Sequence, residues 1–160
     1  MAPLRSGPYT LRILQSNDSK LLVGGEYATA RGPQDVVYLA REGIRGQVWD
    51  VTVEGEDERG YLISLRARGI NDDSLTYLHN KINEPGAPLI LSEEKLFEAR
   101  RENDIEGIGI FSLVPTDIKL VGATWYVGRN DREEVALQPI PVIPDAPPHP
   151  VWAFIPADRY

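Results

Sequence analysis

Apolar and polar residues alternate in short stretches along most of this chain. One pattern occurs three times: an aliphatic residue, a large aromatic residue, a small or polar residue, and then more apolar residues. Its copies lie at residues 47–53, 109–115 and 151–156. Such alternation, with β-branched and aromatic residues, is typical of a half-buried strand. Each copy therefore predicts a strand that packs Trp49, Phe111 or Trp152 into the core.

A second alternating pattern recurs in step with the first, at residues 9–14, 61–66 and 118–121. An opening strand and a closing aromatic strand, each present three times, predict an internal threefold repeat. With the stretches between them, each third holds about four strands. Twelve strands in three units indicate an all-β chain of the β-trefoil type, a six-stranded barrel capped by three hairpins. The predicted domain spans residues 1–160, with repeats at about 7–55, 56–115 and 116–160.

Two stretches depart from this regular alternation. Residues 92–102 (SEEKLFEARRE) have good helix propensity, so they could form a short helical insertion. A strand through Phe97 beside a charged loop is the favoured alternative. Seven of the 13 prolines lie from Pro139 onward. Because proline cannot donate a hydrogen bond to a sheet, this end of the chain is predicted to run extended, at an edge.

The composition excludes several classes of function. The formal net charge is −7, and no Lys- or Arg-rich run appears. Neither nucleic acid nor an anionic membrane is therefore an expected partner. The chain has no cysteine, which excludes disulfides, thiolate metal sites and a cysteine nucleophile. With no apolar signal-peptide run near the N-terminus, a cytoplasmic monomer is the expectation.

Catalytic groups are sparse. The two histidines, His79 and His149, lie in different thirds and do not have the spacing of a metal site. No serine lies in a nucleophile-elbow pattern. Gly107 and Gly109 form a Gly-x-Gly, but before a predicted strand rather than a helix, which is the wrong context for phosphate binding. The sequence predicts a binding protein with no enzyme activity, metal or cofactor. Periodicity alone does not choose between sugars, partner proteins and proteases.

Residues 23–32 (VGGEYATARG) closely resemble the corresponding stretch of the mycocypins, the clitocypin- and macrocypin-like fungal inhibitors of cysteine proteases. Further similarity follows in the same order along the chain. It covers residues 7–9 (GPY), 47–49 (QVW), 69–71 (GIN), and 139–144 (PIPVIP) with 150–152 (PVW). The resemblance implies a β-trefoil that inhibits proteases.

In mycocypins a wedge of the first and third interstrand loops blocks papain-like proteases. By resemblance, the residues expected to make this wedge here are Val23, Gly24, Gly25, Glu26, Arg41, Glu42, Gly43 and Ile44. Glycine has no Cβ and tolerates positive φ, so its backbone can enter a narrow active-site groove closely. The alternative is that the two glycines merely form a turn. The third loop departs from the family pattern, because it is charged where clitocypin has a longer, more apolar loop.

The resemblance also implies a separate loop for legumain, an asparagine-specific protease. Asn71, flanked by Ile70 and Asp72, matches the residue that mycocypins present to this enzyme. An asparagine side chain offers donors and an acceptor, which a polar pocket can recognise. The alternative is an ordinary turn asparagine. Two separate loops imply that papain and legumain are inhibited at the same time.

Two other functions remain open on the same scaffold. Arg31, between the second and third predicted strands, could enter the acidic pocket of a trypsin-type serine protease, as in cospin-type mushroom inhibitors. Arg68 and Lys81 are further candidates for that role. A trefoil lectin is the other alternative. Lectins usually repeat a binding aromatic residue in each third, whereas Trp125 has no clear counterpart.

Overall fold

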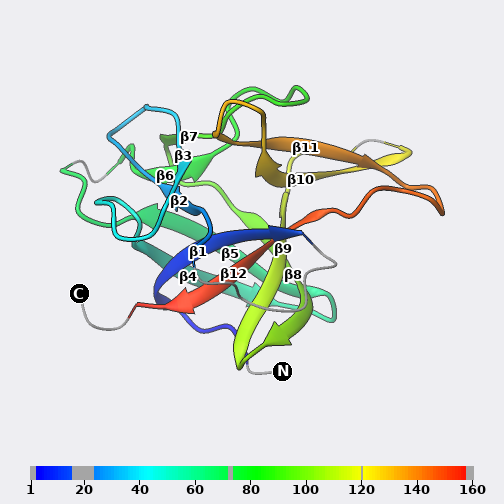
Figure 1. Cartoon of the computed structure of the whole chain (residues 1–160), viewed down its shortest axis with the longest axis horizontal. Coiled ribbons are helices and arrows are strands. Elements are labelled where there is room, and N and C mark those ends of the chain that lie inside the picture. The colour runs from blue at the N-terminus through cyan, green and yellow to red at the C-terminus, as the bar shows by residue number, and fades with distance from the viewer. Residues whose placement is uncertain (1–2, 16–23, 72–73, 120, 158–160) are drawn as a thin grey trace.

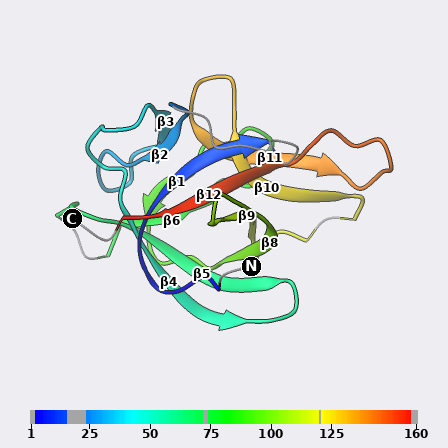
Figure 2. The same ribbon diagram turned by 60° about the horizontal axis from the view of Figure 1, so that its bottom comes forward.

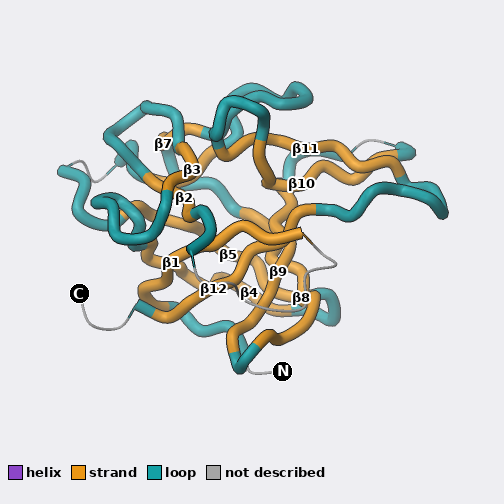
Figure 3. The backbone as a smooth tube through the Cα atoms, viewed as in Figure 1, coloured by secondary structure: helices purple, strands orange, loops and turns teal. Residues whose placement is uncertain are grey.

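The structure is a computed structural model, and it describes residues 3–15, 24–71, 74–119 and 121–157. The described residues form twelve strands joined by turns and loops, with no helix among them (Figure 3). The predicted all-β class is therefore confirmed, and twelve strands are consistent with the predicted β-trefoil. No helix within these ranges is long and apolar enough to span a membrane.

The strands are short at the loop-rich end of the molecule and longer elsewhere. In chain order they are β1 (Gly7–Gln15), β2 (Tyr27–Thr29), β3 (Tyr38–Ala40), β4 (Trp49–Glu56), β5 (Gly60–Ala67), β6 (Tyr77–His79), β7 (Ile90–Ser92), β8 (Phe97–Ile105), β9 (Ile108–Pro115), β10 (Ala123–Arg129), β11 (Val135–Pro141) and β12 (Pro150–Pro156).

Six of these strands pair in a closed ring (Figure 1). The antiparallel pairs run β1–β12, β12–β9, β9–β8, β8–β5, β5–β4 and β4–β1. Ile13 on β1 faces Trp152 on β12, which in turn faces Phe111 on β9. Closure leaves no free edge in the ring, so this part of the chain offers no template for strand addition.

The other six strands form three hairpins, β2–β3, β6–β7 and β10–β11. Backbone bonds link the hairpins to one another in a cycle. The Val37 N–H donates to Leu89 O at 3.0 Å, that of Leu89 to Val135 O at 2.8 Å, and that of Val135 to Val37 O at 2.9 Å. All three side chains are fully buried. This cycle holds the hairpins against one another and fixes where the loops between them emerge.

Large aromatic side chains fill the core, as the repeated pattern predicts. Trp49, Phe111 and Trp152 are at most 1% exposed. The indole N–H groups of the two tryptophans donate to backbone carbonyls, Trp49 to Ala28 O at 3.1 Å and Trp152 to Val127 O at 2.8 Å. Each tryptophan therefore ties a ring strand to a hairpin strand, and its polar atom is satisfied inside the core.

The aromatic strands fall differently along the chain from the prediction. The prediction placed Phe111 at the end of the second third, but it lies in β9, the first strand of the third set of four. The strand that ends the second set is β8, where Phe97 and Ala99 are fully buried while Glu98 and Arg100 are half-buried. This alternation of period two carries a strand through residues that favour a helix, because burial of one face outweighs helix propensity.

One predicted strand is absent. Residues 118–121 were expected to open the last third, but residues 118, 119 and 121 are not in a strand, and residue 120 lies outside the described residues. Thr116 and Asp117 form a turn at the end of β9. The apolar residues there belong to the connection between β9 and β10, in which Ile118 packs against the core while Val121 is exposed.

Pro139 and Pro141 lie at an edge, as predicted, whereas Pro150 and Pro156 lie at the two ends of β12 in the ring, where they pair with β1. Pro139 and Pro141 belong to the outer half of β11, which pairs with β10 in a two-stranded sheet, while the inner half of β11 also bonds to Val37 and Ala87. This ribbon extends away from the ring on the side opposite the loop that joins β3 to β4 (Figures 1 and 2).

Candidate functional site

Two glycines precede β2 in a conformation that few other residues adopt. Gly24 has φ +88° and Gly25 has φ +95°. A Cβ on Gly24 would meet no described residue within 4 Å, whereas a Cβ on Gly25 would overlap the guanidinium of Arg12, 2.6 Å from its Cζ. Both glycines are exposed, while Arg12 is buried beneath them. Glycine is thus required at both positions by backbone conformation, and at Gly25 also by space. Val23 lies outside the described residues.

Glu26 links this glycine loop (described residues 24–26) to the β10–β11 ribbon. Arg129 donates to Glu26 Oε1 at 2.5 Å and to Glu133 Oε1 at 2.8 Å. The pKa of Glu26 is lowered, chiefly by a hydrogen bond from Glu133 and further by Arg129, against the opposing effect of burial. The same bond raises the pKa of Glu133. Glu26 is half-buried, so its ion pair with Arg129 holds the loop in place while part of its side chain stays accessible to a partner.

The charged loop (residues 41–46), which follows β3, is held by one buried amide. Gln47, 5% exposed, accepts a hydrogen bond from the Gly43 N–H at 3.0 Å. Its amide nitrogen donates to Arg41 O at 2.7 Å and to Thr29 Oγ1 at 3.1 Å. The prediction assigned no role to Gln47, because a single glutamine beside a strand carries no distinctive pattern. These hydrogen bonds fix the loop from inside and leave Arg41, Glu42 and Gly43 exposed.

The glycine loop and the charged loop approach each other. The hydroxyl of Tyr27, which follows the glycine loop, lies 3.4 Å from Glu42 Oε2 in the charged loop. Burial raises the pKa of Tyr27 first, and the charge of Glu42 raises it further. The structure thus brings the described residues of the predicted wedge to one end of the molecule.

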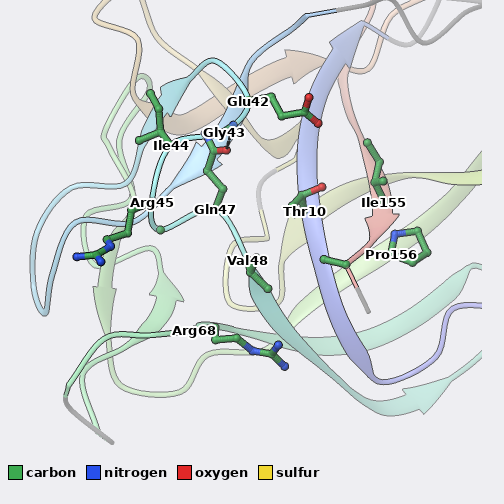
Figure 4. A pocket seen from close by; sticks show the side chains of 12 residues that line it. Thr10, Glu42, Gly43, Ile44, Arg45, Gln47, Val48, Arg68, Ile155 and Pro156 are labelled. Atoms are coloured by element: carbon green, nitrogen blue, oxygen red, sulfur yellow. Dashed lines mark hydrogen bonds between the residues drawn. The ribbon is translucent and has the colours of Figure 1, made fainter. Parts of the chain in front are cut away.

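A groove of about 890 Å³ runs beside the charged loop (Figure 4). Its lining includes residues 42–48, Thr10 on β1, Arg68, and Ile155 on β12. Figure 4 shows the Glu42 side chain directed toward β1, whereas Arg45 extends to the other side of the loop. The charged loop therefore presents two faces, one toward the ring strands and one toward the neighbouring loops.

The second face of the charged loop meets the loop that carries Asn71. A hollow of about 690 Å³ is lined by residues 44–46 on one side and by residues 68–70 on another. Gly69 has φ +84°, Ile70 packs against the core, and Asn71 is exposed just beyond it. Asp72 lies outside the described residues. The papain-type and legumain-type candidates are therefore different residues on one continuous surface.

The basic candidates for a trypsin pocket each have a partner. Arg31 is exposed, but its guanidinium lies 4.1 Å from the centre of the Tyr38 ring. Arg68 pairs with Asp50 at 2.6 Å, and Lys81 pairs with Glu93 at 3.1 Å. Entry into an acidic pocket would require Arg31 to leave its stacking contact.

Trp125, the candidate for sugar binding, is buried, and both histidines contact other residues of the chain. Trp125 is 8% exposed, so its ring is not free to stack on a sugar. His79 Nδ1 lies 2.7 Å from Glu93 O, and His149 Nε2 lies 3.0 Å from Glu102 Oε2. In the described part of the chain, no three His, Cys, Asp or Glu side chains are grouped as a metal site would require.

The geometry is that of a closed ring of strands that displays the candidate loops at one end. The profile of the family described as peptidase inhibitor clitocypin matches residues 7–154. The chain belongs to this clitocypin family of peptidase inhibitors. No curated protein matches the chain. The family match confirms the resemblance drawn from residues 23–32, and its range includes both loops of the predicted wedge and Asn71.

Proposed function

We propose that this clitocypin-family chain is a reversible inhibitor of papain-like cysteine peptidases, whose active-site groove it occludes with residues 23–26 and 41–44. The observation that carries the proposal is the exposed pair Gly24 and Gly25, held beside the charged loop. Because no described residue lies within 4 Å of a Cβ placed on Gly24, its backbone can approach the bottom of a narrow groove. The peptidase acts as the receptor, and this chain contributes no reacting group.

Rigidity supports inhibition by occlusion. Arg12 fills the space beneath Gly25, and Gln47 bonds to the inner side of the charged loop. A loop that is ordered before binding loses less conformational entropy when the complex forms. Such a loop also resists the rearrangement that would let a peptidase draw it through the groove as a substrate.

The proposal includes legumain as a second target, contacted through Ile70, Asn71 and Asp72. Asn71 is exposed after the positive-φ Gly69, which supports a side chain presented to a polar pocket. The sequence implied that both peptidases are inhibited at once. Because residues 44–46 and 68–70 line one hollow, we instead expect the two peptidases to exclude each other while depending on different residues.

We further propose that the scaffold is a β-trefoil. Three features support this: the closed ring of six strands, the three hairpins, and the cyclic backbone bonds through Val37, Leu89 and Val135. A trefoil has no catalytic cleft of its own, so the displayed loops carry the function.

Inhibition constants for papain, legumain and trypsin test the assignment. Gly24→Glu puts a charged side chain on the front of the wedge, so we expect papain inhibition to weaken at least about tenfold. Gly107→Glu is the matched control, because Gly107 is also exposed, has φ +81° and has nothing near its Cβ position. Equal effects of the two variants would reject the wedge.

The other two assignments have single-site tests. Asn71→Ala should abolish legumain inhibition and leave papain inhibition unchanged. If the natural chain inhibits trypsin and Arg31→Ala abolishes that inhibition, the serine-protease alternative is favoured instead. The stacking of Arg31 on Tyr38 leads us to expect no trypsin inhibition.

A further inference from the structure

Exposed apolar side chains gather at one place on this molecule. Among the described residues, four large hydrophobic side chains are exposed: Ile82 at 57%, Val121 at 105%, Val142 at 68% and Ile143 at 56%. Three of the four are neighbours, because the Val142 N–H donates to Gly122 O at 2.8 Å. Contiguous exposed apolar surface on a monomer commonly marks an interaction site.

The cluster lies at the far end of the β10–β11 ribbon. Val121 precedes β10, and the apolar loop (residues 142–149) follows β11 and leads into β12. Figures 1 and 2 both show this end projecting away from the ring, on the side opposite the charged loop. The apolar cluster is therefore distinct from the glycine loop, the charged loop and the loop that carries Asn71.

The apolar loop is held in shape at both ends and in the middle. The Ala146 N–H donates to Ile143 O at 3.2 Å in a turn. At its C-terminal end the His149 ring stacks on Tyr126 with centroids 4.6 Å apart, and His149 Nε2 lies 3.0 Å from Glu102 Oε2. Prolines restrict φ along the segment. The exposed apolar side chains are thus presented on an ordered projection.

The chemistry of this projection suits an apolar cleft. Between Pro139 and Pro150, Asp145 is the only Asp, Glu, Lys or Arg. A convex, nearly uncharged segment is complementary to a concave apolar surface. It also has little to offer a charged or sugar-bearing partner. Because the chain belongs to a peptidase-inhibitor family, the concave partner of this kind is the substrate cleft of a peptidase.

We propose that the apolar loop (residues 142–149), with Val121 beside it, forms a second peptidase-binding loop for enzymes whose substrate clefts accept apolar side chains. Val142 and Ile143 occupy the apolar subsites of such a cleft. Pro144 follows Ile143, so the peptide bond between them is a tertiary amide without an N–H group. The loop is thus a poor substrate as well as a good fit. This site does not depend on the papain and legumain assignments.

Three peptidases that prefer apolar side chains are suitable probes: chymotrypsin, pancreatic elastase and subtilisin. We expect the natural chain to inhibit at least one of them. Ile143→Asp should weaken that inhibition at least about tenfold, because the isoleucine side chain that the complex would bury is lost. Val142→Asp should act in the same direction. Ile82→Asp is the matched control, because Ile82 is equally exposed elsewhere, and it should change inhibition less than about twofold.

Several outcomes would overturn this site. They are no inhibition of any of the three probes, an equal loss with Ile82→Asp, or a natural chain that sedimentation shows to be a dimer and Ile143→Asp converts to a monomer. The last result would assign the patch to a second copy of the chain. Thermal unfolding of each variant checks that it is folded. Papain inhibition should be unchanged in Ile143→Asp, so failure here is distinguishable from failure of the wedge.

Discussion

At the scale of single residues, the site depends on pairs that the sequence does not reveal. Gly24 and Gly25 stand out in the sequence as a doublet, but the reason for the second glycine is Arg12, on a different strand. Arg12 is 5% exposed, and its Nε has no hydrogen-bond partner among the residues that the structure describes. A buried guanidinium close against a backbone is a property of the folded chain, because no local pattern around Arg12 marks it as buried.

The two glycines should therefore respond differently to alanine. Gly24→Ala carries only the backbone penalty of a positive φ, about 1–2 kcal/mol. Gly25→Ala carries that penalty and must also displace Arg12, so we expect at least about 1 kcal/mol more loss of unfolding free energy. Urea denaturation of both variants measures the difference. Equal losses would show that Arg12 does not occupy the space beneath Gly25.

At the scale of elements, the sequence predicted the strand-rich class well and the boundaries less well. Alternation of period two is visible wherever one face of a strand is buried, so most strands could be found. Around Phe97 the outward-facing Glu and Arg side chains are also good helix formers, so a helix remained open beside the favoured strand that the structure has as β8. The stretch at 118–121 has the apolar residues of a strand, but its described residues, 118, 119 and 121, belong to no strand. Whether a stretch forms a strand depends on a partner strand that can lie far away in the sequence.

The charged loop is held in place by the hydrogen bonds of Gln47. In Gln47→Leu the Gly43 N–H and the Arg41 carbonyl lose their partner, which should cost about 1–3 kcal/mol of stability. Papain inhibition should weaken, because the loop is no longer held. Asn80→Leu is the control: Asn80 is a buried amide that bonds Asn83 and Asp117 elsewhere. It should lower stability comparably and leave papain inhibition intact. A loss of inhibition in both variants would trace the effect to stability alone.

At the scale of the whole molecule, a ring without free edges carries loops that differ in charge, shape and length. Family membership could be inferred from residues 23–32 and is now established by the match over residues 7–154. The position of each candidate loop relative to the others could not be inferred, because it follows from how the hairpins pack. That packing brings the loop carrying Asn71 beside the charged loop and leaves the apolar loop on the opposite side.

The molecule should lose stability in acid. The pKa of Glu134 is lowered chiefly by a hydrogen bond from Asn130. For Asp117, burial has the largest effect and acts upward, but bonds from Lys95 and Asn80 outweigh it, so its pKa is also lowered. A lowered carboxyl pKa contributes stability that is present above the ordinary value near 4 and is lost as pH falls through the lowered value.

Asp117→Asn tests this linkage. Allowing for the 42% exposure of the Asp117 side chain, we expect a loss of about 1 kcal/mol at pH 7 that becomes smaller as the pH falls below the ordinary carboxyl value. The corresponding shift in melting temperature at pH 7 is about 2–4 °C. Asp145→Asn, in the exposed apolar loop, should change neither. A loss for Asp117→Asn that is the same at about pH 3 as at pH 7 would contradict the linkage.

The most direct test of the central claim is protection of papain's catalytic thiol. Because this chain contains no cysteine, iodoacetamide added to the mixture can alkylate cysteine only on the enzyme, and mass spectrometry can follow it without interference. We expect the natural chain to slow alkylation of the catalytic cysteine strongly and to be recovered uncut, and the Gly24→Glu variant to protect much less. Alkylation at the same rate with and without the natural chain would contradict occlusion of the active-site groove.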